Sequence, residues 1–194
     1  MSTKPATFDP LDAPLWEGYD YFQSLADAAR AGSYQHLFWV DPKHWKRHKP
    51  PAWIFDLEWK CYRYSDVDTP DKLRAIVTED VPGIYIFSVR PELPVCGFPQ
   101  YALYVGISNA LNSGRIVRER LEDYLPPRIA SIKKRSNIHR MVCLYLPDLW
   151  VHFAYVDKPS DTLIKVERTL HGYLAPPVAD QAYPVDMKHL KPAW

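Results

Sequence analysis

The sequence predicts an α+β protein: a small central antiparallel sheet of about three strands, flanked by helices and preceded by an amino-terminal extension. Runs rich in β-branched and aromatic residues at 82–89, 101–107 and 150–156 indicate the strands. A stretch rich in proline and glycine, 91–99, joins the first two runs and indicates a hairpin with a long connection. Apolar residues recur at helical spacing in 115–125 and 161–174.

We expect residues 1–80 to form the extension and residues 81–194 to form the main domain with a carboxy-terminal tail. A helix is predicted over 19–31, strand in the aromatic segments around 38–40 and 53–64, and a short helix over 71–77. The density of aromatic residues favours packing of the extension on the core over a detached domain. Its role is open between contacting DNA and covering one face of the sheet.

Two tripeptides in the hairpin are the most informative feature of the chain. Gly83-Ile84-Tyr85 lies in the first strand, and Tyr104-Val105-Gly106 lies in the second, so that the second tyrosine follows the first by nineteen positions. A tyrosine on each strand can then face one common site. The alternative is a core hairpin in which both tyrosines only pack and form hydrogen bonds.

The two helical segments add polar residues in a matching order. Arg120 and Tyr124 are four residues apart and therefore share one face of the helix 115–125. In the helix 161–174, Glu167 borders an apolar stripe, and the prolines after Ala175 end the helix. Taken alone, Glu167 is typical of a solvated surface position, and an arginine and tyrosine so spaced are typical of a surface contact.

With these motifs in this order, the chain resembles the GIY-YIG endonuclease superfamily over residues 81–181, with Tyr-Val-Gly as the second tripeptide. The resemblance implies a metal-dependent DNA endonuclease that hydrolyses phosphodiester bonds, with Mg²⁺ or Mn²⁺ as cofactor and double-stranded DNA as substrate. The catalytic residues that it implies are Tyr85, Tyr104, Arg120, Tyr124 and Glu167.

The resemblance also implies a role for each residue. Tyr85 would accept the proton of the attacking water, and because the ordinary tyrosine pKa is about 10, neighbouring cations would have to favour its phenolate or the proton would be relayed through it. Arg120 would stabilise charge on a non-bridging oxygen. Glu167 would hold the metal ion. Tyr104 and Tyr124 would position the water or the scissile phosphate.

Three departures from the family pattern leave alternatives open. The segment 91–99 lengthens the hairpin loop. Arg115 or Arg118 could take the role of Arg120, which we favour because it alone has an aromatic hydrogen-bonding residue four positions later. Asp180 stands where the family has asparagine. The alternative function is a catalytically inactive nucleic-acid-binding module with the same fold. A third possibility is an unrelated α+β protein in which the motifs are accidental.

Basic residues after the first helix predict contacts with the DNA backbone. The net charge of +1 is uninformative, but the run 128–140 holds five basic residues and no acid. The alternative is that these basic residues form an ordinary solvated face. That alternative is favoured for the second basic cluster, at 43–49. The residues predicted to bind nucleic acid are Arg115, Arg118, Lys133, Lys134, Arg135 and Arg140.

Composition indicates a cytoplasmic protein. No apolar run reaches the ~18 residues of a membrane span, and the amino terminus shows no signal-peptide core. The cysteines Cys61, Cys96 and Cys143 are isolated, which argues against a zinc ribbon and against a disulfide framework. His171, four residues after Glu167, is expected on a solvated helix face, with an approach to the metal or phosphate as the alternative.

Overall fold

The computed structural model describes residues 46–90, 101–125, 138, 141–142, 145–176 and 178. Several expectations concern residues outside these ranges and stay predictions. They are the helix over 19–31, the strand near 38–40, the loop 91–99, the basic residues Lys133, Lys134, Arg135 and Arg140, and Asp180.

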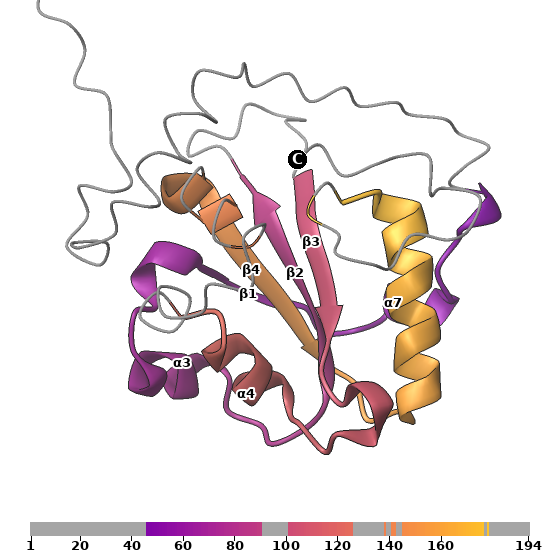
Figure 1. Cartoon of the computed structure of the whole chain (residues 1–194), viewed down its shortest axis with the longest axis horizontal. Helices are drawn as coiled ribbons and strands as arrows, with labels where there is room; N and C mark the ends of the chain where they lie inside the picture. The colour runs from indigo at the N-terminus through magenta and orange to yellow at the C-terminus, as the bar shows by residue number, and fades with distance from the viewer. Residues whose placement is uncertain are drawn as a thin grey trace, which may run out of the picture.

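Four antiparallel strands form one sheet in the order β1-β4-β2-β3 (Figure 1). The strands are β1 (Lys60–Arg63), β2 (Gly83–Val89), β3 (Tyr101–Ile107) and β4 (Leu149–Tyr155). The hairpin pairs Tyr85 with Gly106 and Phe87 with Tyr104, and the register shifts after Phe87. This register brings the two motif tyrosines near each other on one face of the sheet.

The prediction of about three strands was too low by one strand. The additional strand is β1, which pairs Tyr62 with Val151 and Lys60 with Phe153 along β4. Only these four residues of the aromatic segment 53–64 are strand, whereas Ala52–Ile54 and Tyr64–Asp66 form the 3-10 turns η2 and η3. A four-residue strand is too short to show a reliable period of two, so its pairing with β4 defines it.

Three α-helices flank the sheet in the described residues: α3 (Pro70–Ile76), α4 (Val117–Glu122) and α7 (Ser160–Leu174). The helix expected over 115–125 is thus shorter. Ile116 is extended, with φ of −83° and ψ of 165°, and the next N–H, that of Val117, donates to the Val81 carbonyl at 3.1 Å. That bond ties the start of α4 to the segment before β2, and the Glu119 carboxylate accepts from the Ile116 N–H at 3.3 Å.

The sheet separates two apolar layers (Figure 1). On one face, Tyr85 and Phe87 of β2 pack with Leu121 and Tyr124 from α4 and the turn after it. On the other face, residues of β2 and β3 pack against the apolar stripe of α7. Alternate residues of β2 therefore serve opposite layers, as a strand buried on both faces requires. None of the helices in the described ranges is both long enough and apolar enough to cross a bilayer.

Candidate active site

Three tyrosine hydroxyls and one guanidinium meet on the α4 side of the sheet. The hydroxyls of Tyr85 and Tyr124 lie 3.0 Å apart, and those of Tyr104 and Tyr124 lie 3.3 Å apart. Arg120 Nη2 donates to both the Tyr85 and Tyr124 hydroxyls at 3.4 Å. The three rings also contact one another, with centroids 5.6 to 6.2 Å apart. Side chains from β2, β3 and the α4 region thus form one cluster.

The number of hydrogen-bond donors and acceptors in the cluster indicates which hydroxyl donates to which. A guanidinium only donates, and each tyrosine hydroxyl carries one proton and two lone pairs. Tyr85 is fully buried, whereas Tyr104 is half-buried. If Tyr85 donates to Tyr124 and Tyr124 donates to Tyr104, every link is made and the Tyr104 proton remains for a ligand at the surface. In that arrangement the cluster presents a neutral donor, Tyr104, beside a fixed positive charge, Arg120.

The structure contradicts the expectation that neighbouring cations favour the phenolate of Tyr85. Burial raises the pKa of Tyr85 well above its ordinary value, with further increases from Tyr124 and Tyr104, and these outweigh the lowering by Arg120. Burial likewise raises the pKa of Tyr104. Burial therefore keeps both hydroxyls neutral near pH 7, which favours the second option for Tyr85, passage of a proton along the hydroxyls.

Gly106 makes room for the ring of Tyr85. A Cβ at this position would lie 2.4 Å from both Cζ and the hydroxyl oxygen of Tyr85. The ring is enclosed on its other sides by Phe87 and Tyr124, and it has no exposed surface. The glycine of the second tripeptide is therefore explained by contact with the tyrosine of the first tripeptide.

Substituting Gly106 with alanine is expected to destabilise the fold by about 1 to 3 kcal/mol, because the ring must move within a packed core. Denaturant unfolding would measure this loss. In a Tyr85→Leu background, which lacks the far end of the ring, the same substitution should cost much less. An equal loss in both backgrounds would contradict the steric explanation.

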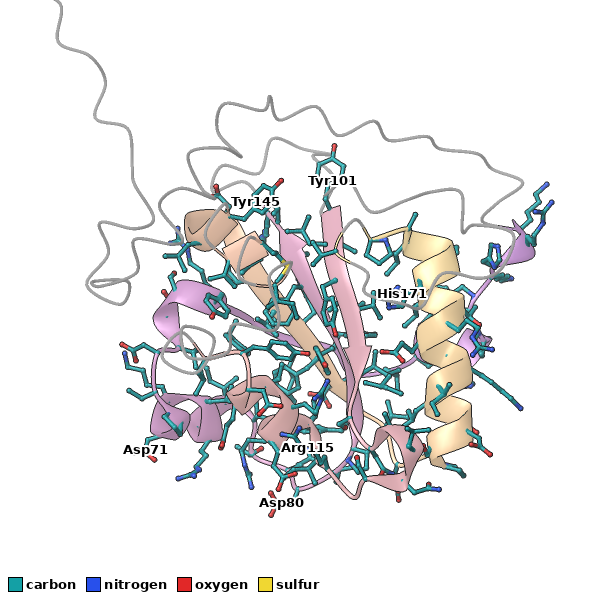
Figure 2. The ribbon with its side chains drawn as sticks, viewed as in Figure 1. Asp71, Asp80, Tyr101, Arg115, Tyr145 and His171 are labelled. Carbon is teal, nitrogen blue, oxygen red and sulfur yellow. The ribbon has the colours of Figure 1, made fainter. Side chains whose placement is uncertain are left out.

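The structure distinguishes the three candidate arginines by their partners. Arg120 reaches the tyrosines, and its Nη1 also donates to the Asp123 carboxylate at 3.4 Å. Arg115 donates to the same carboxylate at 2.8 Å and lies at the outer end of the α4 region (Figure 2). Arg118 forms an ion pair with Asp80. The geometry therefore brings Arg120, rather than Arg115 or Arg118, to the tyrosine cluster.

Glu167 approaches the cluster from α7, at the outer edge of β3. Burial raises its pKa to about 7, although Arg120 and a hydrogen bond from the Ile107 N–H lower it. In turn, the charge of Glu167 contributes to the raised pKa of Tyr104. The carboxylate is therefore within electrostatic range of both Arg120 and Tyr104. Glu167 is half-buried rather than a fully solvated surface residue.

His171 is buried between α7 and β3 (Figure 2), so the expected solvated face was wrong. Its Nε2–H donates to the Val105 carbonyl at 3.1 Å. Burial lowers its pKa to about 4, which leaves the ring neutral at pH 7. His171 and Glu167 thus bind outward-facing backbone groups of β3, two residues apart, and a strand edge satisfied in this way is protected from pairing with another chain.

Sequence reasoning missed two residues that hold the cluster in place. Asp123 accepts from Arg120 and Arg115, and its spacing of three residues from Arg120 was the available signal. Tyr64 donates to the backbone carbonyl of Tyr124 at 2.5 Å across sixty residues of chain. No local pattern predicts that contact.

The residues present fit a hard divalent cation with few protein ligands. No group of three or more His, Cys, Asp or Glu side chains in the described residues is arranged to hold a metal ion. Glu167 is the carboxylate that the resemblance assigns to the metal, whereas the Asp123 carboxylate is bound by Arg115 and Arg120. Mg²⁺ commonly binds through one or two carboxylates while keeping several waters. A partly desolvated carboxylate with a raised pKa is also one whose charge a cation would stabilise.

No family model matches the chain, and neither a curated protein nor a solved structure shows a significant match to it. The resemblance to the GIY-YIG superfamily therefore rests on the residues of this chain and on how they are arranged.

Proposed function

We propose that the protein is a metal-dependent endonuclease that hydrolyses phosphodiester bonds of duplex DNA. The observation that carries the proposal is that Tyr104 and Arg120 both bond to the Tyr124 hydroxyl, while the Glu167 carboxylate on α7 lies within electrostatic range of both. These residues supply a neutral donor, a permanent cation and a carboxylate. Phosphodiester hydrolysis requires such groups, because negative charge accumulates on the phosphate oxygens in the transition state.

Each residue has a role consistent with its environment. Arg120 donates to a non-bridging phosphate oxygen and stabilises the charge that develops there. The Tyr104 hydroxyl donates a hydrogen bond to the same phosphate and so helps to position it. Tyr85 and Tyr124 are positioning residues, because their hydroxyls orient Tyr104 and Arg120 from inside the protein.

Glu167 would hold the Mg²⁺ or Mn²⁺ ion, which when bound supplies a Lewis acid and a water of lowered pKa. Asp123 keeps the guanidinium of Arg120 in place from the side opposite the tyrosines. The buried tyrosine hydroxyls exclude water from the inner side of Arg120, which strengthens its interaction with a phosphate.

Incubation of the purified chain with supercoiled plasmid and Mg²⁺ tests the proposal. The expected result is nicked or linear DNA, with no cleavage when EDTA removes the metal. Duplex binding without cleavage at any Mg²⁺ or Mn²⁺ concentration would instead favour the inactive DNA-binding module. Neither binding nor cleavage would overturn both functions.

A further inference from the structure

The loop after β3 holds a leucine in a backbone conformation that leucine avoids. Asn109, Leu111 and Asn112 have φ of 56°, 54° and 55°. Asparagine adopts this left-handed region with little penalty, but leucine does not. Leu111 is also 85% exposed, more than Phe55 at 59%, which is the other exposed large hydrophobic residue among the described ones. The loop thus presents an apolar side chain to water from a strained position.

The loop is anchored at several points. The Gly114 N–H donates to the Asn109 side chain at 2.9 Å, and the Ser113 N–H donates to the Ala110 carbonyl at 3.2 Å. The Asn112 N–H donates to Ser160 Oγ at 3.2 Å, and Ser160 is buried at the start of α7. Strained conformations persist where the surrounding structure determines them, and they concentrate at functional sites.

The anchor on α7 relates Leu111 to the candidate active site. Seven residues of α7 separate Ser160 from Glu167, which corresponds to about 10 Å along the helix axis. That length equals about three base-pair steps of duplex DNA. A duplex that has one phosphate at Arg120 and Glu167 and runs along α7 would extend past the tip of this loop.

The chemistry of the loop matches the minor groove. Residues 108–114 contain no charged side chain, and the residues around Leu111 offer amide and hydroxyl groups. Proteins that bend DNA from the minor groove use this combination, in which asparagine reads base edges and an apolar wedge such as leucine separates two stacked base pairs.

We propose that Leu111 inserts between base pairs in the minor groove about three steps from the cleaved phosphate, and that Asn109 and Asn112 contact the neighbouring base edges. The inference rests on the proposed function, since duplex DNA is the partner in both. Insertion kinks the duplex, and the kink brings the phosphate backbone toward Arg120.

Duplexes with 2-aminopurine at successive positions along their length test the insertion, with the full chain in EDTA. Wild-type protein should raise the fluorescence at one step as the base loses its stacking. Leu111→Gly and Leu111→Asn should abolish that rise and weaken duplex binding by roughly tenfold or more, since they remove one buried leucine contact. Both variants should melt at the wild-type temperature or above it, because glycine and asparagine tolerate this φ.

Phe55→Ala is the matched control, because it removes exposed apolar surface from a residue with an ordinary φ of −78°. It should leave both fluorescence and affinity unchanged. Wild-type fluorescence and affinity in the Leu111 variants would overturn the inference.

The outcomes separate this inference from the proposed function. Plasmid cleavage with no fluorescence change at any position would support the proposed nuclease function and contradict the insertion of Leu111. A Leu111-dependent fluorescence rise without Mg²⁺-dependent cleavage would support the insertion of Leu111 and contradict the nuclease function. Failure of the wild-type chain to bind duplex DNA would contradict both proposals.

Discussion

Replacing Arg120 with alanine is expected to lower the single-turnover rate of DNA cleavage by roughly 10²- to 10³-fold, with much less effect on duplex affinity. The guanidinium is held by the Tyr85 and Tyr124 hydroxyls and by Asp123, so its charge is fixed before substrate binds. A preoriented charge acts mainly on the transition state, where the phosphate oxygens carry the most negative charge. Rapid-quench cleavage and fluorescence anisotropy on the same variant would measure both effects.

Arg115→Ala provides the matched control. It removes the same charge from the same region of the chain and likewise removes one of the two arginine donors to the Asp123 carboxylate. Because Arg115 binds Asp123 and Glu119 rather than the tyrosine hydroxyls, its loss should affect salt-dependent binding more than turnover. If Arg115→Ala loses as much turnover as Arg120→Ala, the fixed charge at the tyrosines has no special role.

Replacing Glu167 with glutamine is expected to abolish Mg²⁺-dependent cleavage while the protein stays folded. Glutamine retains the shape and a carbonyl oxygen that accepts from the Ile107 N–H, but it removes the negative charge needed to hold a divalent cation. Plasmid cleavage across a Mg²⁺ titration would measure the effect. Cleavage by the variant at wild-type rates would exclude Glu167 as the metal ligand.

The same substitution should stabilise the metal-free protein at alkaline pH. The folded pKa of Glu167, about 7, is above its ordinary value of 4.5, so the folded state binds this proton more tightly than the unfolded state. Its contribution to stability is fully present below pH 4.5 and is lost as pH rises through 7. At pH 8 in EDTA, Glu167→Gln should therefore gain on the order of 1 kcal/mol after allowance for partial exposure.

Thermal melts of both proteins at pH 5 and pH 8 would measure this gain. The difference in melting temperature between variant and wild type should be larger at pH 8. A variant that is inactive and also less stable at pH 8 would point to a structural role for the carboxylate rather than a role in metal binding.

Local spacing in the sequence determined much of the secondary structure. The strands at 101–107 and 83–89 and the helix ending at Leu174 were predicted within a residue or two, because alternation along a strand and the four-residue recurrence along a helix are visible in a short window. The proximity of Arg120 to Tyr124 followed in the same way, since both lie one helical turn apart.

Only the tertiary structure decided which groups meet and in what ionisation state. The fourth strand depends on pairing with β4, and the burial of Tyr85 depends on the rings and the glycine around it. The position of Glu167 at the edge of β3 and the strained exposure of Leu111 likewise depend on contacts between distant segments. Sequence spacing encodes the direction of neighbouring side chains, whereas desolvation and strain arise from everything packed around a residue, and this is why they became visible only in the folded chain.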